Sequence, residues 1–182
     1  MNAPRASAAP AEGEPAAASG RLDRLRALVG AVPDPEIPVL TLADLGILRD
    51  VREEAGRLVV ELTPTFSGCP ATAVIAADVR AVLAAAGEPD ADVRIVLSPA
   101  WTTDWIGPQA REKLRRYGIA PPGKAAATGV SVLRFASPPD AIRCPRCGSA
   151  RTEALSAYGS TPCKSLHRCL ACREPFDWFK TH

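Results

Sequence analysis

The sequence predicts a domain that contains both helices and strands, followed by a small zinc-binding ribbon. Two observations lead to this fold class. Between residues 21 and 135, stretches with the helical period of about 3.6 residues alternate with stretches in which every second residue is apolar. Near the C-terminus, two Cys-x-x-Cys pairs lie about twenty residues apart, a spacing typical of structural zinc sites. A chain of 182 residues is long enough for one modest domain and one small one.

Composition and charge argue against several classes of protein. The formal net charge is only +2 and the isoelectric point is near 8.3, whereas a non-specific nucleic-acid binder normally has a larger basic excess. No apolar stretch is long enough to span a membrane, and no apolar run near the N-terminus resembles a secretory signal. Paired cysteines without such a signal indicate metal binding in a reducing compartment. We therefore expect a cytoplasmic protein without nucleic-acid or membrane partners.

The chain is predicted to begin with a disordered tail over residues 1–19. This segment contains no Leu, Ile, Val or aromatic residue, so burial cannot offset the entropy lost on ordering it. An amphipathic helix follows from about Arg21. It must end before Pro33, because proline disfavours the helical conformation in the residue before it.

The middle of the chain is predicted to contain three strands and two helices. Alternating apolar residues predict strands over residues 47–53, 57–63 and 93–97. One apolar stripe predicts a helix over residues 70–86, and the glycine after it suits the C-terminal cap. A second helix, over residues 108–117, has proline at its first position and glycine after its last.

The C-terminal part is predicted to start after a further strand over residues 130–135 and a Pro-rich linker. We place the boundary so that the α+β domain covers residues 20–137 and the ribbon covers residues 138–182. Phe176, Trp178 and Phe179 are expected in a final strand that packs over the metal-binding turns.

The four cysteines of the two pairs are the predicted zinc ligands: Cys144, Cys147, Cys169 and Cys172. Four thiolates complete a tetrahedron around Zn²⁺ and leave no open position, which favours a structural rather than a catalytic site. Iron in a rubredoxin-like site is the main alternative, since thiolates alone do not distinguish the two metals. Cys163 and His167 lie between the pairs, so Cys163 could be a spare ligand, a redox thiol or a packed side chain.

Cys69 is the main candidate outside this tetrad. It lies beside Pro70, where the helix over residues 70–86 is predicted to start, and the unpaired amides and dipole of a helix N-terminus favour an anion. The thiol is therefore expected to have a lowered pKa and to be a good nucleophile or soft-metal ligand. An equally weighted alternative is a small buried cysteine that packs under the turn.

Asp34, Glu36 and Asp44 surround a Pro-rich turn before the first predicted strand. Carboxylates on such a stiff loop could orient a metal ion or a basic group of a partner. Turn formation and helix capping are the favoured interpretation, because Asp-Pro commonly starts a turn.

Trp101 and Trp105 directly follow the third predicted strand. Tryptophan is enriched at binding hot spots, so this loop could be a protein-contact patch. A hydrophobic lid over the core is the favoured interpretation.

Three motifs of the α+β domain resemble those of the SufT-like family of metal–sulfur cluster biosynthetic domains. They are Asp34–Pro38 (DPEIP), Asp44–Ile47 (DLGI) and Thr63–Pro70 (TPTFSGCP). Two further segments in the ribbon point to a more specific family: Gly159–Lys164 (GSTPCK) and Glu174–Lys180 (EPFDWFK). With them, the chain apart from its tail resembles the PaaD (also called PaaJ) family of small accessory subunits associated with the phenylacetyl-CoA ring epoxidase system.

This resemblance implies that the first domain has a small α+β fold with a mixed sheet and that a zinc ribbon follows it. It also implies a role in assembling or transferring iron–sulfur clusters, within aerobic phenylacetate degradation. There, a di-iron oxygenase epoxidises the ring of the thioester, and a reductase with a flavin and a [2Fe–2S] cluster supplies electrons. The chain would be an accessory protein and not an enzyme. It carries neither a di-iron carboxylate motif nor a Gly-rich dinucleotide fingerprint, which agrees with that role.

We therefore expect a protein that helps install an iron–sulfur cluster, with the reductase as the first candidate recipient and the oxygenase as the second. Cys69 would act as a transient ligand or thiol, and Asp34, Glu36 and Thr65 would shape its pocket. Structural zinc would be the resident metal, a transient iron–sulfur cluster a further ligand, and Cys163 an additional thiol. The ribbon and the tryptophan loop would dock the recipient.

Three other functions are weighed against this one. The chain could be a stable, non-catalytic subunit that bridges oxygenase and reductase, in which case Cys69 would be dispensable. It could be a nucleic-acid-binding zinc ribbon, against which the near-balanced charge counts. It could also be an electron carrier with iron in the tetrad.

Overall fold

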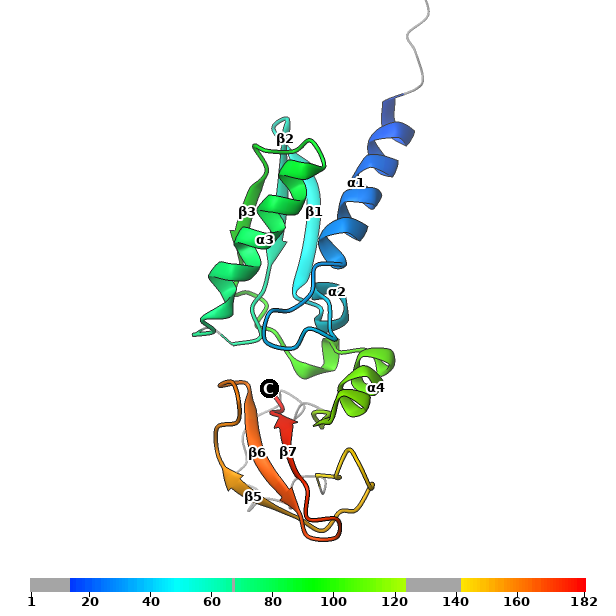
Figure 1. Ribbon diagram of the computed structural model, residues 1–182. Coiled ribbons are helices and arrows are strands. Elements are labelled where there is room, and N and C mark those ends of the chain that lie inside the picture. The colour runs from blue at the N-terminus through cyan, green and yellow to red at the C-terminus, as the bar shows by residue number, and fades with distance from the viewer. Residues whose placement is uncertain (1–13, 67, 124–141) are drawn as a thin grey trace, which may run out of the picture.

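The computed structural model describes residues 14–66, 68–123 and 142–182. Within these ranges an α+β domain lies above a ribbon built around the C-terminal strands (Figure 1). The predicted strand over residues 130–135 and the predicted boundary at residues 137 and 138 fall outside the described residues. None of the described helices combines the length and the apolar character needed to cross a membrane.

The first helix, α1, spans Glu14–Gly30. It ends before Pro33 as predicted, but it begins earlier than expected, so residues 14–19 of the predicted tail are helical. Leu25 and Val29 lie one helical turn apart and are fully buried, so one stripe of α1 packs on the sheet.

Three strands form the sheet of the α+β domain: β1 (Leu48–Glu54), β2 (Arg57–Leu62) and β3 (Asp92–Ile95). Strands β1 and β2 are antiparallel, whereas β2 and β3 are parallel, which confirms the mixed sheet. Ala55 and Gly56 both have positive φ angles, as a two-residue hairpin turn requires. The crossover between the parallel strands contains helix α3 (Ala71–Ala85), which covers the same face of the sheet as α1 (Figure 1).

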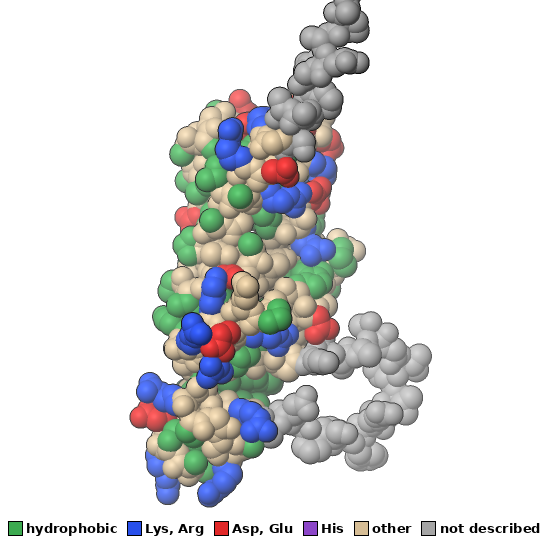
Figure 2. All heavy atoms as spheres, turned by 90° about the vertical axis from the view of Figure 1, so that its right-hand side faces the viewer, with side chains coloured by type: hydrophobic (Ala, Val, Ile, Leu, Met, Phe, Trp, Pro, Cys, Tyr) green, Lys and Arg blue, Asp and Glu red, His purple; other side chains and the backbone are tan. Residues whose placement is uncertain are grey.

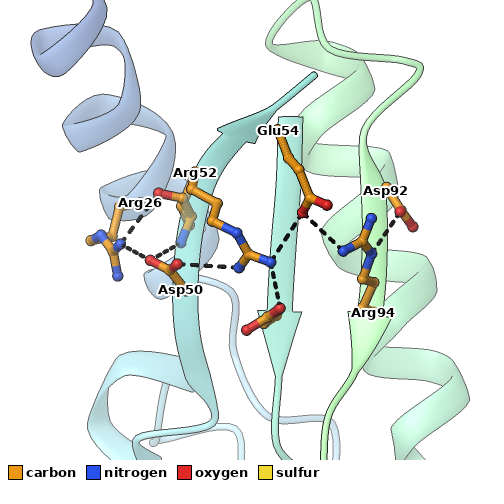
Figure 3. A network of polar contacts seen from close by, with 8 residues as sticks. Arg26, Asp50, Arg52, Glu54, Asp92 and Arg94 are labelled. Atoms are coloured by element: carbon orange, nitrogen blue, oxygen red, sulfur yellow. Dashed lines mark hydrogen bonds and ion pairs between the residues drawn. The ribbon is translucent and has the colours of Figure 1, made fainter. Parts of the chain in front are cut away.

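The opposite face of the sheet is covered by charged side chains. Figure 3 shows this network from α1 across to β3; it includes Arg26, Asp50, Arg52, Glu54, Asp92 and Arg94. The charged groups are partly exposed, and such pairs each contribute little to stability. Val59 is nonetheless only 1% exposed, since it pairs with Arg52 on one side and Asp92 on the other. The outer surface of this face is therefore made of charged groups, and they shield Val59 from solvent.

The third strand is shorter than predicted. Val93 is buried, but Ile95 and Leu97 are 41% and 60% exposed, so the alternation over residues 93–97 does not mark one buried face. The backbone N–H of Val96 donates to Leu62 O at 2.9 Å, after which the pairing ends. Helix α4 spans Pro108–Tyr117, with the bounds expected from its proline and its glycine.

Two short helical segments were not predicted. Helix α2 (Leu42–Leu45) is closed by a capping box in which Thr41 and Asp44 bond to each other's backbone N–H. The other is a 3₁₀ turn, η1, over Thr103–Trp105. Both are too short to give a periodic signal in the sequence.

The ribbon contains β5 (Thr152–Ser156), β6 (Lys164–Cys169) and β7 (Pro175–Phe179). Its sheet has the order β4-β7-β6-β5, and β4 is only Ile119–Ala120, directly after α4. Because β4 pairs with β7 in parallel, the ribbon sheet includes residues well before the predicted boundary.

The ribbon has a more basic surface than the chain as a whole. Figure 2 shows Lys and Arg side chains gathered on it, at the lower end of the view. Exposed arginines near the cysteine turns include Arg143, Arg146, Arg151 and Arg173. The net charge of +2 therefore averages over parts with different charge.

The last strand joins the two parts of the molecule. Phe176 and Trp178 pack with the cysteine turns as predicted, but Phe179 is 1% exposed and belongs to the core of the α+β domain. Its ring centroid lies 6.1 Å from that of Trp101. The carbonyl of His182 accepts a hydrogen bond of 3.1 Å from the N–H of Thr103. The chain end thus anchors the ribbon against the domain.

Candidate functional site

The four predicted zinc ligands converge, with all their sulfur atoms within 4.8 Å of one another. The Sγ atoms of Cys144 and Cys172 are 3.7 Å apart, and those of Cys147 and Cys169 are 3.5 Å apart. A zinc–sulfur bond of about 2.3 Å requires sulfurs about 3.8 Å apart in a regular tetrahedron, so this geometry fits the ion. Within the described residues this is the one group of three or more such ligand atoms.

Each pair of cysteines lies on a tight turn. Gly148 donates to Cys144 O at 2.9 Å, and Arg173 donates to Cys169 O at 3.0 Å. Both donors have positive φ angles, 73° for Gly148 and 68° for Arg173, which close the two turns in the same way. The backbone N–H of Cys172 lowers the pKa of the Cys169 thiol, which favours the thiolate that a metal needs.

His167 and Cys163 do not belong to this tetrad. The Nε2 atom of His167 is 2.9 Å from Ser165 Oγ, and its ring stacks on Phe176 with centroids 5.8 Å apart. Burial lowers the pKa of the imidazole, as expected for a packed histidine. Cys163 lies at the other end of β6 and points into the α+β domain.

A second site lies where the α+β domain meets the ribbon. Its pocket is lined by the four residues predicted to form the Cys69 site, together with Cys163 from the ribbon; the four are Asp34, Glu36, Thr65 and Cys69. The sequence motifs that carry these residues are therefore neighbours in space. Asp44 is not among the lining residues. It caps α2 and pairs with Lys113 at 2.6 Å, in agreement with the capping interpretation.

Asp34 shapes the loop that carries Glu36. Its Oδ1 atom accepts hydrogen bonds of 2.8 Å from the backbone N–H groups of both Glu36 and Ile37, and the residue is only 8% exposed. This is the turn chemistry expected of Asp-Pro. The turn also directs Glu36 toward the pocket, where its Oε2 atom is 3.9 Å from Cys163 Sγ.

Cys69 is half-buried just before helix α3, as predicted, but its thiol does not have the predicted lowered pKa. Burial raises the pKa, the N–H groups of Ala71 and Thr72 oppose that rise, and the carboxylates of Glu36 and Asp34 add to it. The helix N-terminus thus acts in the expected direction. The prediction was wrong because burial and two nearby carboxylates outweigh it.

Cys163 is buried beside polar side chains, those of Thr161, Glu36 and Lys164. Its Sγ atom is 3.1 Å from Thr161 Oγ1. Burial raises the pKa of the thiol, the Thr161 hydroxyl opposes this, and Glu36 adds to it. Burial also raises the pKa of Glu36, as does Asp34. At neutral pH both thiols of the pocket therefore hold their protons.

Lys164 was missed by the sequence analysis. Its side chain is 4% exposed, its Nζ atom is 3.8 Å from Asp177 Oδ2, and its charge acts on Glu36. A lysine at the start of a strand normally extends into solvent, so only its place beside Cys163 in the sequence could have drawn attention to it.

The tryptophan loop covers the core, as the favoured interpretation proposed. Trp101 is 6% exposed, and its Nε1–H donates to Leu45 O at 2.7 Å. Trp105 stacks against Trp101 edge-on and lies under the guanidinium of Arg49, which is 3.8 Å from the ring centroid. Trp101 is therefore unavailable for contact with a partner.

Comparison with known proteins identifies both parts of the chain. Residues 22–97 match the family described as iron–sulfur cluster assembly protein, and residues 131–180 match the PaaD zinc beta ribbon domain. The chain is 48% identical over 154 residues to an Escherichia coli (strain K12) protein that is named as a subunit of a "Putative 1,2-phenylacetyl-CoA epoxidase". The match covers 85% of this chain and 89% of that protein.

A shorter match covers the α+β domain. The chain is 37% identical over 82 residues to the Staphylococcus aureus (strain USA300) protein named Fe-S protein maturation auxiliary factor SufT, covering 44% of this chain and 92% of that protein. A crystal structure of the domain of unknown function DUF59 from Bacillus anthracis is 29% identical, with a TM-score of 0.48, and covers 54% of this chain and 95% of that one. The two family matches and the two sequence relatives confirm both resemblances found in the sequence motifs.

Proposed function

Because the chain belongs to the PaaD family, we propose that it is an accessory protein of the phenylacetyl-CoA epoxidase system in aerobic phenylacetate degradation. It assists the assembly or transfer of an iron–sulfur cluster and catalyses no step of the epoxidation itself. Its partners are the oxygenase and the reductase, and it acts in the cytoplasm, where thiols stay reduced. The reductase receives the cluster, since it is the component expected to carry a [2Fe–2S] centre.

The observation that carries this proposal is the pocket of Cys69. A half-buried thiol lies beside two carboxylates, in the part of the chain that matches the iron–sulfur cluster assembly family. Thiolates are the protein ligands that iron–sulfur clusters prefer, and carboxylates can take up the protons that the thiols release. Cys69 itself is partly exposed, and Phe66 and Gly68 of the loop before it are exposed.

The cysteine tetrad has a different role. Its four thiolates would hold zinc with no position left for a substrate, so the metal supplies folding energy to the ribbon. The basic surface around it gives the ribbon a means of docking an acidic surface of the recipient.

Cluster content of the recipient tests the proposal. Oxygenase and reductase components are produced together with this chain, or with its Cys69→Ala variant, and iron and sulfide per reductase are measured after anaerobic purification. We expect the reductase to lose most of its cluster with Cys69→Ala, while the variant keeps its zinc. Val74→Ala is the matched control on the adjacent helix α3, because Val74 is 48% exposed and does not line the pocket. Full clusters with Cys69→Ala would refute the proposal.

A second candidate function is a stable subunit that bridges oxygenase and reductase. The observation in its favour is that the Escherichia coli relative is named as a subunit. In that case the chain would purify in a fixed ratio with both components, and Cys69→Ala would change neither that ratio nor the cluster content.

A further inference from the structure

The two cysteines outside the tetrad come from opposite parts of the chain and line one pocket. Cys69 precedes α3 in the α+β domain, and Cys163 precedes β6 in the ribbon. The carboxylate of Glu36 connects them. It is 3.9 Å from Cys163 Sγ, and its charge acts on both thiols. The pocket therefore exists only when the ribbon is docked on the domain.

The backbone holds both cysteines in place. The N–H of Cys69 donates to Phe66 O at 3.0 Å, and its carbonyl accepts from Thr72 at 3.2 Å. The carbonyl of Cys163 accepts from the N–H of Lys180 at 3.0 Å, one residue after the buried Phe179. The contact that anchors the ribbon thus also positions Cys163.

The surroundings of Cys163 differ from those of a cysteine that only packs. A structural cysteine behaves as a small hydrophobic side chain among apolar neighbours. Cys163 is 8% exposed, yet it lies next to Thr161, Glu36 and the buried ammonium group of Lys164. Burying a thiol among such polar groups costs free energy, which indicates that this position does more than fill space.

We propose that Cys69 and Cys163 are the two thiol ligands of a single site, formed between the α+β domain and the ribbon, that takes ferrous iron as its cargo. This inference deepens the proposed function and rests on it. When iron binds, two sulfur–iron bonds form and two S–H bonds break. Glu36 accepts the proton of Cys163, the proton of Cys69 leaves to solvent, and no electron is transferred.

Two ligands suit a cargo that must leave again. The tetrad surrounds its metal with four thiolates, whereas this pocket supplies two and leaves positions open for sulfide or for a ligand of the recipient. A partner can therefore bind the iron before either cysteine releases it.

Cobalt binding tests the inference. The full chain, with zinc in its tetrad, is titrated anaerobically with Co²⁺ alone. Cobalt binds a given set of ligands less tightly than zinc does, so it leaves the tetrad occupied and reports on the second site. The intensity of the thiolate-to-cobalt charge-transfer absorption in the near ultraviolet is proportional to the number of thiolate ligands. The titration is repeated with Fe²⁺ alone and with Fe²⁺ plus sulfide, to distinguish free iron from a cluster as the cargo.

The expected result is one Co²⁺ per chain beyond the zinc. Cys69→Ser and Cys163→Ser should each weaken binding by at least about tenfold and remove about half of the charge-transfer intensity, because each leaves one of two thiolates. Leu155→Ala is the matched control in the ribbon, since Leu155 is 48% exposed. Unchanged zinc content shows that each variant keeps its ribbon.

The outcomes separate this inference from the proposed function. If Cys163→Ser binds cobalt as the wild type does, or if the wild type binds none, the two-thiol site is overturned. The cluster content of the reductase with Cys69→Ala still decides the proposed function in either case. If both serine variants lose binding together, the site is supported whichever component receives the iron.

Discussion

Replacing Phe179 with alanine tests whether the last strand holds the ribbon on the α+β domain. The side chain is 1% exposed, belongs to the core of that domain and packs against Trp101, with ring centroids 6.1 Å apart. Truncating a buried phenylalanine to alanine removes apolar burial and leaves a cavity, at a cost of about 3–5 kcal/mol. We expect the free energy of unfolding to fall by that amount.

This loss is large for a chain of 182 residues. Since each 1.4 kcal/mol is about a factor of ten, the folding equilibrium should change by roughly two to four orders of magnitude. At about 2–4 °C per kcal/mol for chains of this length, the melting temperature should fall by roughly 6–20 °C. Cys163 should also lose its position, because its carbonyl bonds to the residue after Phe179.

Urea unfolding and cobalt titration measure the two effects on the same samples. Phe179→Leu keeps most of the volume and should cost less than about 1.5 kcal/mol. Leu155→Ala is the control, because Leu155 is 48% exposed, and its effect should stay within about 0.5 kcal/mol. A change of less than about 1 kcal/mol for Phe179→Ala would refute the buried anchor. A large loss of stability with unchanged cobalt affinity would refute its link to Cys163.

Three further predictions follow from single contacts. Cys144→Ser should lower zinc below one per chain and unfold the ribbon, since structural zinc supplies folding energy; full zinc with a protease-resistant ribbon would contradict the tetrad. Trp101→Phe should cost about 1–3 kcal/mol in urea unfolding, because it leaves the buried carbonyl of Leu45 unpaired; no loss would show that the bond is dispensable. Burial raises the pKa of Asp44, but the Lys113 ammonium and the capping bonds together lower it by more than burial raises it, so the net pKa is depressed. The stability gained from Asp44 is therefore present above the unfolded-state pKa of about 3.9 and is lost as the pH falls through the folded-state value. The difference in melting temperature between wild type and Asp44→Asn should thus be constant from about pH 7 to about pH 5 and shrink below about pH 4; a difference that grows on acidification would contradict this assignment.

Features set by neighbouring residues could be predicted from the sequence. The two Cys-x-x-Cys turns form the expected tetrad, because two residues of spacing place both sulfurs of a pair on one turn. The bounds of α4 follow from the proline at its first position and Gly118 after its end, where φ is 94°. The turn at Asp34 likewise forms by its own hydrogen bonds.

Features set by contacts between residues that are distant in the sequence could not be predicted from it. The pairing of β4 with β7 and the insertion of Phe179 into the domain core depend on how the ribbon packs, and neither leaves a periodic signal. The pKa of Cys69 was predicted from its own helix alone, whereas burial and the carboxylate of Glu36 decide the direction. The uneven charge of the two parts is also lost when only the total of +2 is considered.

The position of Cys163 gives the ribbon a role beyond that of a stable appendage. A zinc-stabilised ribbon can hold one residue with little freedom at the edge of another domain, because its turns and strands are fixed by the metal and by sheet pairing. Here that residue is a cysteine, and it lines the same pocket as the one cysteine that the α+β domain supplies. Zinc loss would then abolish iron binding without removing either thiol ligand. Replacing all four tetrad cysteines with serine removes the zinc and leaves cobalt no thiol site among the ribbon turns. Loss of Co²⁺ binding in this variant would show that the second metal site depends on the first, and retained binding would show that it does not.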